Sequence, residues 1–147
     1  SEAIQLRYEN VMPGALFFPI EITKNKLSPR SIPITDDFQQ VLINWKLQCE
    51  EAGESTDPKC YLFKGRYKNT HLSSRAFMKV LKAASIKADL IGTSSHSFRR
   101  SGLCSASDAN IPLRHIQEIS GHRNLGTLQK YLAVSDDQLK AAASAMA

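Results

Sequence analysis

Apolar and other residues alternate in two short stretches of the N-terminal half, which predicts a β-hairpin. Every second residue is apolar from Leu16 to Ile22, and the alternation returns at Ile32 and Ile34. This period of two is that of a strand with one buried face. Pro19 cannot donate a ladder hydrogen bond, so we expect an edge or bulged strand. Residues 24–29, rich in lysine and containing a proline, would form the tip of the hairpin.

Two longer stretches have helical spacing. Thr35 or Asp36 is expected to cap the first helix, and a polar segment from Glu50 to Lys59 to follow it as a loop. The apolar residues of the first helix share one stripe that is predicted to face inward: Phe38, Val41, Leu42, Trp45 and Cys49. A second capped helix is predicted to start near Ser73, and its inward residues would be Phe77, Val80, Leu81 and Ala84.

Further helices are predicted in the C-terminal half. One follows Ser94 and Ser95 and runs from His96 to about Asp108. The next has Pro112 at its first turn and ends at Gly121, with Leu113, Ile116 and Ile119 inward. The sequence Ser135–Gln138 resembles a capping box before an Ala-rich helical tail. The predicted fold class is α+β, a mostly helical domain with one small antiparallel β-sheet.

Length and composition narrow the class of protein. A chain of 147 residues, 42% hydrophobic and 22% charged, fits one compact globular domain. No apolar run approaches the roughly 20 residues that span a bilayer, and no leader sequence is recognisable. Cys49, Cys60 and Cys104 are widely spaced and odd in number, which favours reduced thiols in a cytoplasmic protein.

The positive charge is concentrated in one part of the chain. The formal net charge is +5, but residues 64–100 contain nine Lys or Arg and a single acid, Asp89, so this stretch alone carries +8. Concentrated positive charge attracts polyanions and gives salt-dependent attachment to phosphates. A solvated basic face would have the same composition, so charge suggests a nucleic-acid partner without naming the chemistry.

Three short motifs follow one another in a fixed order: His96-Ser97-Phe98-Arg99, then Gly121-His122, then Tyr131. The chain here resembles the tyrosine recombinase family of the phage-integrase type, in which H-x-x-R, G-H and a tyrosine come in this order at similar intervals. Most of the similarity lies between His96 and Tyr131, including the segment L-x-x-I-Q-E-I-S-G-H. Each motif alone is weak, and the ordered set is specific.

The resemblance implies a role for each of these residues. Tyr131 would attack a DNA phosphate to form a 3′-phosphotyrosine, while Arg99 would hold the non-bridging oxygens. His96 and His122 would hydrogen-bond the phosphate, with His96 the better candidate for proton transfer. Lys24 on the hairpin would be the general acid for the leaving oxygen, in competition with Lys26. The family uses no metal and no nucleotide cofactor.

These residue types suit the chemistry. A phenol has a pKa near 10, so it is scarcely ionised at neutral pH and needs activation, whereas a guanidinium keeps its charge and offers a planar fork to phosphate oxygens. Each also has a structural interpretation: His96 as a cap, His122 as a helix-terminus hydrogen bonder, Tyr131 as a packed aromatic. A zinc site from His96, His122 and Cys104 fits no common ligand spacing. Arg100 is expected to contact DNA backbone or protein, and His71 and His115 to be surface residues.

One family residue is missing. The family has another Arg in a segment resembling G-x-R-x-S-E, and Ser1-Glu2 matches the end of that segment, so this Arg is expected upstream of Ser1. Arg7 and Arg30 should not replace it. We therefore expect residues 1–147 to be a catalytic-domain fragment, impaired alone, that lacks the first catalytic Arg and an N-terminal DNA-binding domain.

By the resemblance, the function is site-specific DNA recombination. The full-length protein would act as a homo-tetramer on double-stranded DNA, whereas the fragment could be monomeric. Two alternatives stay open: type IB topoisomerase-like nicking and resealing by the same residues, and a basic DNA-binding module without catalysis. The expected location is the cytoplasm, at the nucleoid, in a protein of bacterial, phage or mobile-element origin.

Overall fold

The computed structural model describes residues 2–23, 28–122, 124–129 and 136–146. It divides the chain into two compact units, residues 1–83 and residues 84–147. Both contain helices, and the β-sheet lies in the first unit, so the α+β class predicted from the sequence is confirmed. None of the described helices is both long and apolar enough to cross a membrane.

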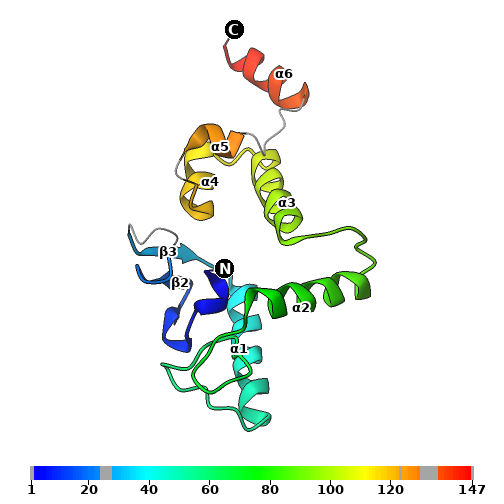
Figure 1. Cartoon of the computed structure of the whole chain (residues 1–147). Coiled ribbons are helices and arrows are strands. Elements are labelled where there is room, and N and C mark those ends of the chain that lie inside the picture. The colour runs from blue at the N-terminus through cyan, green and yellow to red at the C-terminus, as the bar shows by residue number, and fades with distance from the viewer. Residues whose placement is uncertain (1, 24–27, 123, 130–135, 147) are drawn as a thin grey trace. The chain divides into compact units, whose positions relative to one another are not determined.

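A small antiparallel sheet forms the first unit together with one long helix. Strands β1 (Val11–Met12), β2 (Ala15–Phe18) and β3 (Arg30–Pro33) pair in the order β1-β2-β3. The register places Leu16 opposite Ile32 and Phe18 opposite Arg30. The predicted hairpin of β2 and β3 is therefore present (Figure 1). Strand β1 was not predicted from the alternation.

Strand β2 ends earlier than its alternation predicted. After Phe18 the chain turns, because Ile22 N donates to Pro19 O at 3.2 Å and the Thr23 hydroxyl donates to Ile20 O at 2.9 Å. These local bonds replace the ladder that Pro19 could not continue. Ile20 and Ile22 consequently follow the strand, and Ile22 still packs against the core of the unit.

The core of the first unit joins the sheet to helix α1 (Asp36–Glu51) and to the irregular N-terminal segment. That segment holds two short 3-10 turns, η1 (Ala3–Gln5) and η2 (Tyr8–Asn10). The buried residues of the core come from these parts and from the segment after α1: Leu6, Tyr8, Phe18, Leu42 and Leu62. Thr35 caps α1 as predicted, since its hydroxyl accepts from Phe38 N at 3.3 Å.

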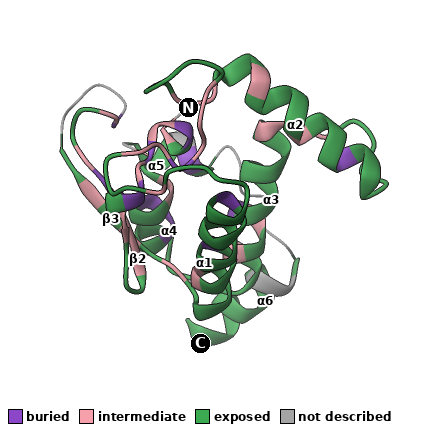
Figure 2. Cartoon of the chain, turned by 90° about the horizontal axis from the view of Figure 1, so that it is seen from below, coloured by how far each residue is buried: buried purple, intermediate pink, exposed green. Residues whose placement is uncertain are grey.

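The inward faces predicted for the two long helices are only partly buried. On α1, Leu42 and Cys49 are buried, whereas Phe38, Val41 and Trp45 are exposed. Helix α2 (Ser74–Lys87) starts where predicted, yet Ser85 is the buried residue that it contributes, and Phe77 and Val80 are exposed. Figure 2 shows most of α2 as exposed surface. An apolar stripe shows which face of a helix can be buried, but whether that face is covered depends on tertiary contacts.

The second unit contains helices α3 (Ser95–Asp108), α4 (Leu113–Ser120), α5 (Leu125–Gln129) and α6 (Asp136–Ala145). Leu103, Ile116 and Leu128 form its buried cluster, one from each of α3, α4 and α5. Leu113 and Ile119, predicted to face inward, are exposed at the edge of α4. Ser135 of the predicted capping box lies outside the described residues. The cluster fixes α3, α4 and α5 against one another, and this fixes the polar groups at their ends.

Candidate functional site

The start of α3 presents His96 and Arg99 on one side of the helix. Ser94 caps the helix, because its hydroxyl accepts from Ser97 N at 3.2 Å. The Ser97 hydroxyl in turn accepts from Ser94 N at 3.2 Å, which completes a capping box. His96 and Arg99 are three positions apart, a spacing that places side chains on neighbouring turns of one helical face. Both are exposed, so both can reach a ligand in solvent.

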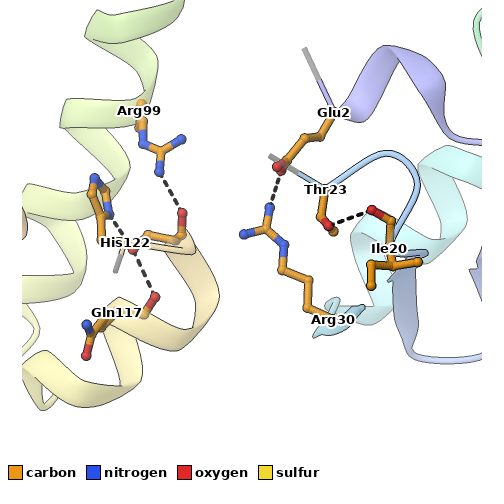
Figure 3. Close-up of polar contacts among 8 residues, drawn as sticks. Glu2, Ile20, Thr23, Arg30, Arg99, Gln117 and His122 are labelled. Carbon is orange, nitrogen blue, oxygen red and sulfur yellow. Dashed lines mark hydrogen bonds and ion pairs between the residues drawn. The ribbon is translucent and has the colours of Figure 1, made fainter. Parts of the chain in front are cut away.

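Arg99 is oriented by the C-terminus of α4. Its Nη2 donates to the backbone oxygen of Ser120 at 2.6 Å (Figure 3). The last carbonyls of a helix lack partners within the helix and carry partial negative charge, so a guanidinium is favoured there. The exposed guanidinium has further N–H donors besides the one in this bond. Arg99 is thus held near α4 while remaining able to bind an anion.

Gly121 brings His122 back toward the same helix end. It ends α4 with φ +69°, in the left-handed region that favours glycine, and its N–H donates to Gln117 O at 2.9 Å. The next residue, His122, is half-buried, and its Nδ1 lies 2.7 Å from the Ser120 hydroxyl oxygen. The same hydroxyl donates to Gln117 O at 3.3 Å. Gly121 was predicted to end this helix, and that prediction is confirmed.

The His122 imidazole titrates under the influence of its surroundings. Burial lowers the pKa of His122 below its usual value of 6.5, and the positive charge of Arg99 lowers this pKa further. His122 is therefore predominantly neutral at pH 7. Both side chains contact Ser120, although Arg99 comes from helix α3 and His122 follows Gly121 after α4.

Ser120 is the residue that connects them, and the sequence did not assign it a role. Its backbone oxygen holds Arg99 and its hydroxyl contacts His122. Ser120 lies within the L-x-x-I-Q-E-I-S-G-H segment that carried the resemblance. The available signal was its position directly before Gly-His. A serine at this position does not by itself predict either contact, because the contact with Arg99 uses a backbone oxygen that every residue possesses.

The other predicted site residues fall partly outside the described residues. Tyr131 lies two positions after the end of α5 at Gln129, and neither it nor Lys24 and Lys26 is among the described residues. His115 is exposed as predicted. His71, predicted to be a surface residue, is half-buried, because its ring packs edge-on against Tyr61 at 5.4 Å between ring centres.

Both flanks of residues 24–27 are fixed within the first unit. On one side, Thr23 is buried. On the other, Arg30 forms an ion pair with Glu2 at 2.5 Å (Figure 3). Its guanidinium carbon lies 5.0 Å from the centre of the Phe18 ring. Arg30 is engaged in these two contacts within the first unit.

The described residues contain no group of His, Cys, Asp and Glu side chains arranged to hold a metal ion. What the second unit does provide is a cationic guanidinium and a neutral imidazole at one helix terminus, with a second imidazole one turn along α3. This set of side chains is typical of a site that binds a phosphate group. Fold and site thus define an α+β domain that brings Arg99 and His122 together at the end of α4.

Comparison with known proteins identifies the family. The model for the phage integrase family matches residues 1–138, and the chain belongs to that family. It is 31% identical over 125 residues to the tyrosine recombinase XerC of Syntrophus aciditrophicus, covering 80% of this chain and 38% of that protein. It is also 31% identical over 143 residues to XerC of Halalkalibacterium halodurans, covering 95% of this chain and 47% of that protein. The chain thus spans less than half the length of these relatives.

Solved structures show the same fold. The crystal structure of XerA recombinase superposes with a TM-score of 0.76 at 17% identity, covering 99% of this chain and 52% of that one. The XerH site-specific recombinase, solved bound to its palindromic difH substrate, superposes with a TM-score of 0.69 at 22% identity, covering 97% of this chain and 40% of that one. The resemblance inferred from the ordered motifs is confirmed.

Proposed function

We propose that this chain is the catalytic part of a site-specific DNA recombinase that cleaves and rejoins strands through a 3′-phosphotyrosine at Tyr131. The observation that carries the proposal is the convergence of Arg99 and His122 on Ser120. Two groups that the family motifs supply from separate segments, 23 positions apart, are held at one helix terminus. A phosphate-binding site needs such convergence, whereas motifs that matched the family only by chance would have no reason to meet in the fold.

The proposed reaction distributes the roles as follows. Tyr131 gives its phenolic proton to His96, its oxygen attacks the scissile phosphorus, and the bond from phosphorus to the 5′ oxygen breaks. Arg99, His96 and His122 neutralise or hydrogen-bond the non-bridging oxygens, where fixed donors are worth several kcal/mol each in the transition state. Lys24 gives its proton to the departing 5′ oxygen, with Lys26 as the rival donor. Rejoining reverses these steps, so neither metal nor nucleotide takes part.

The proposed partner is double-stranded DNA, and the proposed working form of the whole protein is a homo-tetramer on two sites. The activity of residues 1–147 alone is expected to be low, because the family pattern places a further phosphate-binding Arg upstream of Ser1. Removing one such donor from a phosphate site costs about two to three orders of magnitude in rate, by analogy with an oxyanion-hole donor.

The test is formation of a covalent protein–DNA adduct on nicked duplexes. A nick close to the cut lets a short 5′-hydroxyl fragment diffuse away, so the phosphotyrosine cannot be resealed and accumulates. Because the target site is unknown, the duplexes carry randomised sequence on either side of the nick. The adduct is detected after denaturation in detergent. The 147-residue chain is compared with a version extended upstream to supply the expected Arg.

The proposal predicts an adduct that is stronger in the extended version and absent from Tyr131→Phe. DNA binding without any adduct in the extended version would support the inert DNA-binding module instead. An adduct that persists in Tyr131→Phe would show that another residue is the nucleophile. Relaxation of supercoiled plasmid without exchange between two sites would favour the topoisomerase-like alternative.

A further inference from the structure

A tight turn of residues 64–71 projects an unusual group of side chains from the first unit. Arg66, Tyr67 and Lys68 are all exposed at its tip, and Tyr67 has 74% of its surface in contact with solvent. A large aromatic side chain exposed to this extent between two cations buries little area within its own unit. Its contribution to folding is correspondingly small.

The backbone of this turn is strongly determined. Lys64 and His71 form an antiparallel bridge at its base, and the N–H of Gly65 donates to Thr70 O at 2.8 Å. Thr70 closes the tip, since its N–H and its hydroxyl both donate to Tyr67 O, at 3.2 and 2.7 Å. Asn69 has φ 58°, in the left-handed region that asparagine tolerates better than most residues. The tip therefore has a defined shape before any partner binds.

Gly65 shows how closely the two sides of the turn approach. A Cβ atom at this position would lie 2.5 Å from the backbone oxygen of His71, far inside van der Waals contact. The base is also anchored to the rest of the unit. The His71 ring packs edge-on against the Tyr61 ring. Tyr61 also contacts Arg7, whose guanidinium carbon lies 4.5 Å from the centre of the Tyr61 ring.

The charge around the tip is positive and uncompensated. No Asp or Glu occurs between Asp57 and Asp89. Lys64 at the base forms an ion pair with Glu54 at 3.0 Å, whereas neither Arg66 nor Lys68 forms an ion pair with any carboxylate in the part of the chain that the structure describes. An acidic partner is the natural complement of such a tip.

We propose that the Arg66–Tyr67–Lys68 tip is a preformed contact to the DNA backbone, in which the two cations bind phosphates and Tyr67 packs against the sugar or hydrogen-bonds a phosphate. The choice of DNA as the acidic partner rests on the proposed function. Arg, Lys and Tyr are among the side chains that commonly contact phosphate and sugar. Because such contacts do not depend on sequence, the tip would fix the position of the protein on the duplex rather than select the site.

The test measures binding to a 30-base-pair duplex of arbitrary sequence between 50 and 200 mM salt, by fluorescence anisotropy. All proteins carry Tyr131→Phe, so that no covalent adduct contributes to the signal. The double variant Arg66→Ala/Lys68→Ala is compared with Lys46→Ala/Lys59→Ala, which removes the same two positive charges from exposed positions elsewhere in the first unit. The two variants therefore have equal net charge.

Each phosphate contact contributes about 0.9 to the slope of log K against log salt. Loss of both cations at the tip should lower that slope by about 1.8, which at 0.1 M salt corresponds to a loss of about 60-fold in affinity. The control pair should change affinity by less than about threefold, as expected for long-range charge effects that are largely screened at this salt. Tyr67→Ala should weaken binding several-fold at unchanged salt slope.

A second variant tests the preformed shape. Gly65→Ala keeps every charge but forces the backbone near His71 to move, so it should weaken DNA binding while thermal denaturation shows that the chain still folds. Equal binding by the tip variant and the control pair would overturn the proposal, and so would failure of all forms to bind DNA. If the tip variant lowers the salt slope but the upstream-extended version with Tyr131 intact forms no adduct on nicked duplexes, the proposed function fails and this inference stands.

Discussion

Replacement of Ser120 by alanine tests whether the contact with His122 positions the phosphate-binding groups. The change removes the hydroxyl that lies 2.7 Å from His122 Nδ1 and that donates to Gln117 O at 3.3 Å. It leaves the backbone oxygen that accepts from Arg99 at 2.6 Å. Ser120→Ala therefore separates the two connections that meet at this residue, since the Arg99 contact persists and the His122 contact is lost.

The size of the effect follows from these contacts. A neutral hydrogen bond contributes about 0.5 to 1.5 kcal/mol, and the half-buried His122 can recover part of this by bonding to water. If the lost contact raises the barrier to cleavage by its full value, the rate falls by about 2- to 13-fold. Loss of the imidazole itself in His122→Ala removes a donor to the phosphate and should cost about two to three orders of magnitude.

The assay is the single-turnover rate of adduct formation on a nicked duplex at saturating protein, which separates the cleavage step from DNA binding. Ser120→Thr retains a hydroxyl and should restore most of the rate. If Ser120 had only a structural role, the cleavage rates of the variants would instead follow their thermal stabilities. If Ser120→Ala cleaves as fast as the parent while His122→Ala is inactive, the hydroxyl does not position the imidazole and the interpretation of this contact is wrong.

Three further outcomes are expected. Leu128→Ala empties a fully buried site in the second unit and should destabilise it by about 3 kcal/mol in denaturant unfolding; a loss below 1 kcal/mol would show that the cluster is not its core. Because the pKa of His122 is lowered on folding, the unfolded chain binds the His122 proton more readily, so the free energy of unfolding should fall as pH drops below 6.5. His122→Asn should remove that part of the pH dependence. Identical profiles of stability against pH for the parent and the variant would contradict the assignment. Lys24→Ala should slow cleavage by about 10²- to 10⁴-fold. The rate should recover when sulfur replaces the 5′ leaving oxygen, because a thiolate leaves without a proton. Lys26→Ala should show neither the loss nor the recovery, and the reverse result would make Lys26 the acid.

The helices of this chain were predictable because their ends are encoded locally. Thr35 and Ser94 each accept a bond from the backbone N–H three residues later, and Gly121 takes up the left-handed conformation that ends α4. A cap depends on residues adjacent in sequence, so it can be inferred without knowing the tertiary fold. Strand β2 was less predictable, because Pro19 ends its ladder although the alternation continues to Ile22.

Burial was the least predictable property. The stripe on α1 was correctly placed at Leu42 and Cys49, but Phe38 and Val41 on its margin are exposed. Periodicity identifies the direction in which a helix is apolar, and it contains no information about the width of the surface that covers it. The width is set by residues far away in sequence, as when Trp45 donates to Leu62 O at 3.0 Å.

The geometry at Ser120 carries a consequence for how the site would respond to a phosphate. A serine hydroxyl has one proton, so it cannot donate to both Gln117 O and His122 Nδ1 at the same time. When it donates to Gln117, Nδ1 of the neutral imidazole carries the proton and Nε2 is an acceptor, which repels a phosphate oxygen. When it donates to Nδ1, Nε2 carries the proton and becomes a donor. A phosphate at Nε2 therefore favours rotation of the hydroxyl toward His122, and the weaker bond to Gln117 at 3.3 Å is the one given up. Arg99 favours the neutral imidazole, so this rotation is a route by which His122 would become a donor at neutral pH without taking up a proton.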